Sequence, residues 1–321
     1  MSKPRVVFMG TPAFAVPCLK ALIEADYDVV LAVMQPDKPV GRKRVMTAPP
    51  VKQLAEAHGI PVYQPARVKK NPEALETLKA VNADLFVVVA YGKILPQSIL
   101  DLPRHGCINV HASLLPAYRG SAPIQWSIVK GEKETGITTM VMDAGMDTGD
   151  MLLKSTVPIT HTDTAVTLSE KLSEAGAKLL LETLPGYLSG DVKPVPQDHE
   201  AATTIPMLKK EDGELDWQKP AEALYNQIRG FTPWPGTYTF FKDKTLKVKR
   251  ARLYMEQPDE YRGVPGQILD VGKDFIRMRC GEGVLELLEV QLAGSKAMDA
   301  GSFARGQRLT PAEFMGAQPV C

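Results

Sequence analysis

The sequence has few cysteines and no cysteine pair of the metal-binding type. The four cysteines among the 321 residues, Cys18, Cys107, Cys280 and Cys321, lie far apart in the chain. This spacing argues against a disulfide framework and against a structural zinc site. A chain of this length can form two domains that each bury a core without such cross-links. We therefore expect a protein of a reducing compartment, the cytoplasm.

Long apolar runs are also absent. The longest, at residues 85–91, is too short to span a bilayer. The apolar run that follows Lys3 and Arg5 ends at Gly10, which is too early for a signal peptide. We expect neither secretion nor insertion into a membrane.

The chain has no excess of charge of one sign, since its formal net charge is +1. Global attraction to phosphate therefore cannot support a nucleic-acid partner. Two local basic clusters remain. Residues 38–52 contain five basic residues and no acidic one, among them Arg42, Lys43 and Arg44. Such a cluster either binds RNA phosphates or is a solvated loop.

The second basic cluster covers residues 242–252, with six basic residues and one acidic residue, Asp243. Lys247 and Lys249 alternate with Leu246 and Val248. Alternation with a period of two predicts a strand whose lysines share the exposed face. This face either contacts phosphates or is simply solvated.

The glycines of a dinucleotide-binding turn are missing as well. The first turn reads GTPAFAV, with Gly10 alone where that fingerprint has three glycines. An ordinary strand-to-helix turn, with Pro12 suited to it, explains the pattern better. We do not expect an NAD site.

Short apolar runs alternate with helical periodicities over the first 190 residues. We expect strands at 6–9, 29–34, 61–64 and 85–90, helices at 51–58, 72–81 and 164–187, and a Pro/Gly-rich loop at 36–50. Strands that are apolar on both faces are typical of parallel sheets covered by helices on each side. The pattern predicts an open, doubly wound, mostly parallel α/β sheet over residues 1–190.

The character of the sequence changes beyond residue 190. Residues 191–208 mix proline and polar residues without periodicity and are interpreted as a linker. A helix is expected at 220–231, followed by strands at 237–241, 245–254, 266–271, 275–280 and 284–290. Several short strands in succession predict a small β-barrel or sandwich over residues 209–321.

The residues best suited to chemistry begin in the segment INVHASLLPAYRG. Asn109 and His111 should share one side of a strand at its carboxyl end, where ligands bind in open α/β sheets. An amide can donate to an oxyanion and an imidazole can donate or shuttle a proton, so the pair suits acyl transfer. The alternatives are a structural histidine and an asparagine that caps a turn.

A second segment, TGITTMVMDAGMDTGDM, places Asp143, Asp147 and Asp150 in one turn. A carboxylate beside His111 would fix the tautomer of its imidazole. A divalent-metal loop is the weaker interpretation, because such loops offer more oxygen ligands at closer spacing. All three aspartates could also be turn formers. The residues themselves do not choose among the three.

NVHASLLPAYRGSAPIQ followed by TGITTMVMDAGMDTGD resembles the paired signatures of the folate-dependent formyltransferases. The resemblance implies a Rossmann-like catalytic domain, a formyltetrahydrofolate donor, no metal, and catalytic roles for Asn109, His111 and Asp147. It also implies that the SLLP turn lines the tetrahydrofolate site, through Ser113, Leu114, Leu115 and Pro116.

Three further segments resemble the members of this family that act on methionyl-tRNA: GTPAFAVPCLKAL, DKPVGRKRVMTAPPVK and DW…IRGFTPWPGT. This likeness covers nearly the whole chain. It implies formyl transfer from 10-formyltetrahydrofolate to the amino group of methionyl-initiator-tRNA, for translation initiation, by a protein that we expect to be monomeric. It also implies an oligonucleotide-binding-like C-terminal barrel. The expected tRNA contacts are Arg42, Lys43, Arg44, Lys247 and Lys249.

Two alternatives belong to other functional classes. A related enzyme could formylate an amino sugar on a nucleotide with the same first domain; the basic loop and the barrel argue against it. A non-catalytic RNA-binding module on an inert sheet would fail to bind a folate.

Overall fold

The computed structural model of the chain describes residues 3–41, 43–256 and 262–316. The contacts divide the chain into two compact units. The first comprises Met1–Pro123, Glu134–Pro158 and Ser169–Ile205, and the second comprises Ile124–Lys133, Ile159–Leu168 and Pro206–Cys321. Each unit therefore combines segments that are separate in the sequence.

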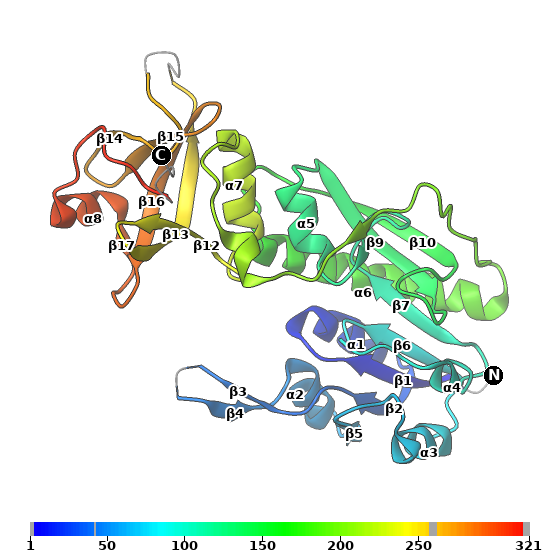
Figure 1. The fold of residues 1–321 in the computed structure, drawn as a ribbon. Coiled ribbons are helices and arrows are strands. Elements are labelled where there is room, and N and C mark those ends of the chain that lie inside the picture. The colour runs from blue at the N-terminus through cyan, green and yellow to red at the C-terminus, as the bar shows by residue number, and fades with distance from the viewer. Residues whose placement is uncertain (1–2, 42, 257–261, 317–321) are drawn as a thin grey trace. The chain divides into compact units, whose positions relative to one another are not determined.

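The first unit is built on a seven-stranded sheet in the order β10-β9-β7-β6-β1-β2-β5 (Figure 1). Its strands are β1 (Arg5–Gly10), β2 (Asp28–Val33), β5 (Val62–Tyr63), β6 (Leu85–Val89), β7 (Cys107–His111), β9 (Glu134–Val141) and β10 (Met151–Pro158). The first five are parallel, β9 runs antiparallel to β7, and β10 runs antiparallel to β9. The predicted doubly wound, mostly parallel sheet is confirmed.

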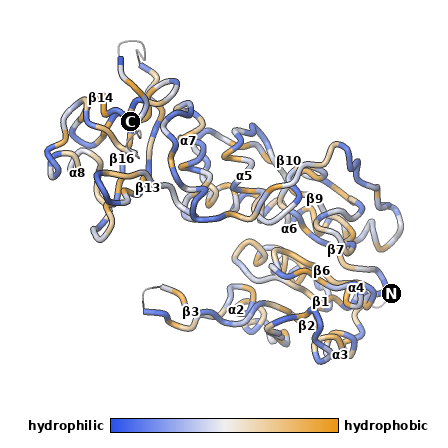
Figure 2. The backbone as a smooth tube through the Cα atoms, in the orientation of Figure 1, coloured by the Kyte–Doolittle hydropathy of each residue, from blue (hydrophilic) through white to orange (hydrophobic). Residues whose placement is uncertain are grey.

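Helices cover both faces of this sheet. The helices that begin in the first 190 residues are α1 (Val16–Glu24), α2 (Pro50–Ala57), α3 (Pro72–Ala80), α4 (Gln97–Leu100), α5 (Pro123–Val129) and α6 (Ala165–Ser189), with a 3-10 turn η1 (Ala13–Ala15). Of these, α5 belongs to the second unit from Ile124 onward. Phe86 and Val88 of β6 share a buried cluster with Leu78 of α3 and Ile99 of α4. Figure 2 shows hydrophobic residues running through the central strands. Burial on both faces is why the strands are continuous apolar runs.

The opposite face packs against α6. A Cβ atom added at Gly176 of this helix would lie 3.1 Å from Val110 Cγ1 and 3.9 Å from Cys18 Sγ. Val110 belongs to β7, and its side chain points away from that of the next residue, His111. The helix therefore supports β7 from behind and leaves the Asn109 and His111 side to other groups.

Residues 36–50, predicted as a loop without regular structure, contain a β-hairpin instead. β3 (Lys38–Val40) and β4 (Val45–Thr47) pair antiparallel around a turn with Gly41 and Arg44 at positive φ. Pro39 fits because a two-stranded ribbon has an unpaired edge that needs no donor. Proline and glycine obscured this hairpin in the sequence. Lys43 and Arg44 are exposed at its tip, and Arg42 lies outside the described residues.

The stretch that was interpreted as a linker is attached to the first unit at several points. Val195 pairs with Met151, and the short strand β11 (Thr204–Ile205) runs parallel to β8 (Arg119–Gly120). Residues 191–205 therefore extend along the unit that carries β7.

The second unit contains a six-stranded antiparallel sheet in the order β12-β13-β16-β15-β14, with a short strand β17 beside β16. Its elements are β12 (Thr237–Phe241), β13 (Lys244–Tyr254), β14 (Ile268–Val271), β15 (Ile276–Arg279), β16 (Val284–Leu292), β17 (Met298–Asp299), α7 (Ala221–Gly230), α8 (Ala300–Gln307) and a 3-10 turn η2 (Lys210–Gly213). The predicted C-terminal domain of short β-strands is confirmed, and its sheet is antiparallel. Leu246, Ile276 and Leu287 lie in its buried core.

A segment near the C-terminus joins the two outer strands of this sheet. On the β14 side, Ile268 N donates to Glu313 O at 2.7 Å and Met315 N donates to Gly266 O at 2.9 Å. On the β12 side, Gly316 N donates to Phe240 O at 2.8 Å. Residues 312–316 thus close the sheet toward a barrel and satisfy edge groups that would otherwise be unpaired.

Within the described part of the chain, no helix has both the length and the apolar character of a transmembrane span.

The buried cysteines generate a prediction about thiol reactivity. Burial raises the pKa of Cys18, Cys107 and Cys280 to about 12 in each case. At pH 8 these thiols stay protonated, and a protonated thiol is a poor nucleophile. In a Cys321→Ser variant, Ellman's reagent should therefore detect almost no thiol in the folded protein and all three in urea. Rapid labelling of the folded variant would contradict the burial of these side chains.

Candidate active site

Asn109 and His111 lie at the carboxyl end of β7, two residues apart and hence on one side of the strand. β7 runs between β6 and β9, so its backbone is held by partners on both sides. Asn109 is half-buried, and its Nδ2 lies 4.0 Å from Met142 Sδ, a weak acceptor. The amide therefore keeps donor capacity for a ligand.

Both ring nitrogens of His111 face acceptors. Nδ1 lies 3.6 Å from Asp147 Oδ1, and Nε2 lies 3.2 Å from the carbonyl oxygen of Tyr118. A carbonyl oxygen can only accept, so Nε2 carries a hydrogen toward Tyr118. The His111 side chain is 8% exposed and that of Asp147 is 17% exposed. The pair is therefore largely shielded from water but remains reachable.

Of the three aspartates, Asp147 is the one whose contact with His111 the structure describes. Its backbone has φ 55°, a left-handed conformation that Asp tolerates better than most residues. Its Oδ2 accepts the backbone N–H of Gly120 at 2.8 Å. Asp143, by contrast, is exposed and accepts from Gly145 N and Thr148 Oγ1 within its own turn. Asp143 is thus a turn former.

The SLLP turn is held by a buried hydroxyl on β9. Thr138 Oγ1 donates to Ser113 O at 2.7 Å and accepts from Leu115 N at 3.0 Å. The Ser113 hydroxyl donates to Ala117 O, and the Leu115 side chain is fully buried. Leu114 and Pro116 are half-buried. In this arrangement, Ser113 and Leu115 hold the turn, while Leu114 and Pro116 are open to a ligand.

Sequence reasoning missed three polar residues next to this site, Arg119, Gln197 and His199. Gln197 is 4% exposed and donates to the backbone oxygens of Asp147 and Gly149. Arg119 in turn donates to Gln197 and His199. Arg119 stood within the signature YRG, but Gln197 and His199 fell in a stretch without periodicity, so no sequence signal marked them.

The predicted RNA-contacting lysines are exposed on β13. Lys247 and Lys249 point outward between the buried Leu246 and Val248, as their alternation implied. Lys247 pairs across the sheet with Tyr238 on one side and Gln291 on the other. Cationic and aromatic side chains therefore lie together on this strand face, a combination suited to nucleic acid.

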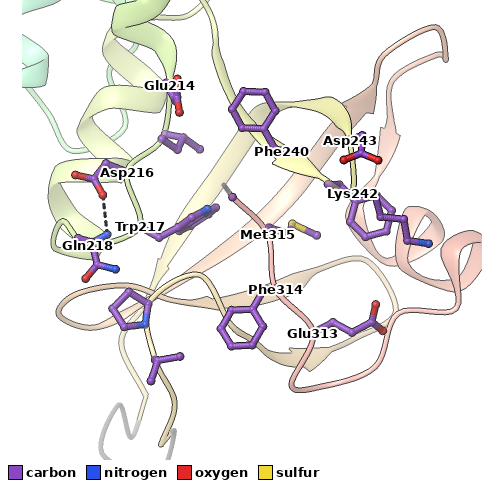
Figure 3. A pocket seen from close by; sticks show the side chains of 15 residues that line it. Glu214, Asp216, Trp217, Gln218, Phe240, Lys242, Asp243, Glu313, Phe314 and Met315 are labelled. Atoms are coloured by element: carbon purple, nitrogen blue, oxygen red, sulfur yellow. Dashed lines mark hydrogen bonds between the residues drawn. The ribbon is translucent and has the colours of Figure 1, made fainter. Parts of the chain in front are cut away.

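A cavity of about 1120 Å³ lies in the second unit, separate from these residues (Figure 3). Trp217, Phe240 and Phe314 contribute aromatic surface to its lining. The charged residues in the lining are Glu214, Asp216, Asp243, Glu313 and Lys242. Four carboxylates against one ammonium group disfavour phosphate there. The described residues that line it also include no histidine to move a proton, so we place the candidate active site at β7, beside the His111–Asp147 pair, instead.

The group at β7 combines an amide donor, an imidazole and a carboxylate that orients it. Such a group can stabilise negative charge on a carbonyl oxygen and move a proton, which are the requirements of acyl transfer. Among residues 3–41, 43–256 and 262–316, the structure contains no cluster of three His, Cys, Asp or Glu side chains arranged to hold a metal ion.

Family models match both parts of the chain. Residues 4–184 match a model described as formyl transferase, and residues 207–308 match one described as formyl transferase, C-terminal domain. A methionyl-tRNA formyltransferase of Citrifermentans bemidjiense is 50% identical over 98% of each chain. One of Myxococcus xanthus is 49% identical over 99% of each chain.

Solved structures share the fold at low sequence identity. HypX from Aquifex aeolicus in complex with tetrahydrofolic acid is 17% identical with a TM-score of 0.66, and the match covers 99% of this chain. The chain spans about half the length of HypX, 51%. WlaRD, a sugar 3N-formyl transferase, is 17% identical with a TM-score of 0.66, over 92% of this chain and all of WlaRD.

Proposed function

The chain belongs to the formyl transferase family, and from this premise we propose that it transfers the formyl group of 10-formyltetrahydrofolate to the amino group of methionyl-initiator-tRNA. The structural observation that carries the proposal is the His111–Asp147 pair beside Asn109, at the carboxyl end of β7. Relatives of about 50% identity along nearly the whole chain bear the name methionyl-tRNA formyltransferase. An amino-sugar substrate and a non-catalytic RNA-binding role are therefore not favoured.

Asn109 and His111 act on charge that exists only in the transition state. As the neutral amine attacks the formyl carbon, negative charge develops on the formyl oxygen. The Asn109 amide donates a hydrogen bond to that oxygen, and a donor of this kind typically contributes about 3 kcal/mol to lowering the barrier. His111 donates or shuttles a proton, for which Nε2–H must exchange its Tyr118 contact for the substrate.

Asp147 acts through His111. Its carboxylate holds the imidazole by Nδ1 and helps the attacking amine to lose its proton. When the tetrahedral intermediate collapses, the bond between the formyl carbon and N10 of the folate breaks, N10 takes up the proton that the amine has lost, and tetrahydrofolate leaves. The folate is therefore a donor consumed in each turnover, and its proposed site is the SLLP turn. The residues fit that role because Leu114 and Pro116 keep exposed apolar surface while Ser113 and Leu115 anchor the turn.

The basic clusters are the proposed tRNA contacts. Lys247 and Lys249 supply phosphate contacts that do not depend on sequence, because a flexible ammonium group recognises charge rather than a base edge. Arg42, Lys43 and Arg44 position the acceptor end. Lys43 and Arg44 are exposed at the tip of a hairpin, a suitable place for contacts with a large ligand.

The remaining predictions concern organisation. We propose a catalytic domain at 1–190, a linker at 191–208 and a tRNA-binding domain at 209–321, in a cytoplasmic monomer. The family matches at 4–184 and 207–308 support the order of the two domains.

A substrate comparison tests the proposed function directly. The protein is mixed with 10-formyltetrahydrofolate and Met-tRNA, with uncharged tRNA and an amino-sugar nucleotide as controls. We expect formylation of Met-tRNA alone, because uncharged tRNA lacks the amine and the sugar nucleotide lacks the tRNA contacts. Formylation of the amino sugar, or no transfer to Met-tRNA, would refute the proposal.

The two aspartates give a matched pair of variants. Asp147→Asn keeps the shape and the tolerance of positive φ but removes the charge beside His111, so kcat should fall roughly a hundredfold or more. Asp143→Asn, in the same loop but engaged only with its own turn, should leave kcat within about threefold of the original. Steady-state kinetics with Met-tRNA measure both. Equal losses would indicate a structural turn rather than a catalytic carboxylate.

The lysines of β13 predict a salt effect. Replacing Lys247 and Lys249 with Ala should raise KM for tRNA, leave kcat nearly unchanged and reduce the slope of log affinity against log salt by about one to two units. Lys20→Ala with Lys79→Ala, two exposed helix lysines of the first unit, removes the same charge elsewhere. If the β13 variant and this control show the same salt slope, the phosphate contacts are misassigned.

A further inference from the structure

Asp147 is held by two different parts of the first unit. Gly120 N–H donates to the carboxylate, as described above, and Gln197 holds the main chain. Nε2 of Gln197 donates to Asp147 O at 2.9 Å and to Gly149 O at 2.7 Å. Both hydrogens of this amide nitrogen are thus committed to the loop that carries Asp147.

Arg119 determines which way the Gln197 amide points. Its Nε and Nη2 both donate to Gln197 Oε1, at 3.0 and 2.7 Å. Nη2 also lies 3.2 Å from His199 Nδ1, which accepts because a guanidinium can only donate. A flipped amide would present its NH₂ group to a guanidinium and its oxygen to two carbonyls. Arg119 therefore excludes the flip, and Nε2 must face the loop.

Two neighbouring residues of β8 act on Asp147, one through its carboxylate and one through Gln197. Arg119 and Gly120 form β8, so one short strand supplies the N–H that binds the carboxylate and the guanidinium that orients Gln197. Arg119 is 7% exposed and Gln197 is 4% exposed. Charge-assisted hydrogen bonds shielded from water in this way are stronger than exposed ones.

We propose that Arg119 and Gln197 are positioning residues for the formyl transfer, which hold the Asp147 carboxylate in register with His111. This inference rests on the proposed function. The backbone of Asp147 is in a left-handed conformation, which an aspartate tolerates but does not favour. Its Oδ1 is 3.6 Å from His111 Nδ1. The loop must therefore be held by its surroundings, and a small displacement would separate the pair.

Gln227 provides a control for a purely structural role. It is 6% exposed, and its Nε2 donates to two backbone oxygens, those of Asp212 at 2.8 Å and Glu214 at 2.9 Å. It belongs to the second unit, whereas Asn109, His111 and Asp147 belong to the first. Gln197→Glu and Gln227→Glu therefore each replace a buried amide donor with an acceptor that faces two carbonyls. The two sites differ in the other side-chain oxygen, which faces Arg119 at Gln197 and has no hydrogen-bond partner among the described residues at Gln227.

The experiment compares Tm, kcat and KM for Met-tRNA in these two variants. We expect both to lower Tm, since each leaves buried carbonyls without donors. Gln197→Glu alone should lower kcat, by roughly ten- to hundredfold, with KM for Met-tRNA within about twofold. Equal relative effects on kcat in the two variants would overturn the proposal. Should Gln197→Glu fail to fold, Arg119→Lys is the second variant. It keeps the positive charge but offers one nitrogen in place of the two that donate to Gln197 Oε1. It should show the same selective loss of kcat, but a smaller one.

A double variant separates failure of this inference from failure of the proposed function. If Gln197 acts through Asp147, Gln197→Glu added to Asp147→Asn should lower kcat by no more than about twofold further. Multiplicative losses would show that Gln197 acts by another route and would refute the positioning role. Full activity of Asp147→Asn would instead refute the catalytic role of Asp147. Normal activity of Gln197→Glu beside an inactive Asp147→Asn would overturn only the proposal made here.

Discussion

The contact between the Asp147 carboxylate and the backbone N–H of Gly120 is the interaction on which the candidate active site depends. It joins the loop between β9 and β10 to the segment that follows the SLLP turn. Together with the hydrogen bonds from Gln197 to the main chain of this loop, it holds Asp147 beside His111, although the two residues are 36 positions apart and lie on different elements. The His111–Asp147 pair is therefore a product of loop anchoring rather than of the strands themselves.

The anchoring works because the sheet beneath it is rigid. β7 is hydrogen-bonded to β6 and β9, and α6 packs against Val110 on the reverse side. Thr138 of β9 fixes the SLLP turn through a buried hydroxyl that serves as both donor and acceptor. The candidate catalytic groups thus lie at the end of β7 and on loops whose ends are held by a scaffold, an arrangement that combines precise geometry with access for a large substrate.

The second unit has a different architecture, an antiparallel sheet with one buried face and one exposed basic face. Its antiparallel sheet buries one face and leaves Lys247 and Lys249 on the other, next to Tyr238. Residues 312–316 bond to both outer strands, so the sheet presents few free edges to other chains. The acidic lining of its cavity and the basic face of β13 give this unit surfaces of opposite charge, and only the basic one suits RNA.

Periodicity and residue type were sufficient to predict the doubly wound sheet, the C-terminal domain of short strands and the outward lysines of β13. These features follow from burial, which repeats every second residue in a strand and so is visible along the chain. The position of Asn109 and His111 at the end of β7 could also be predicted, because it depends only on the residues next to them in the sequence. The hairpin at β3 and β4 was not predicted, because proline and glycine are weak signals for strands, although an isolated ribbon tolerates both.

The contacts of Asp147 with His111 and Gly120, and the part played by Arg119 and Gln197, were decided by the tertiary structure alone. Gln197 is 50 residues from Asp147 in the sequence, and a hydrogen bond between a side chain and a distant backbone oxygen leaves no periodic pattern from which it could be predicted.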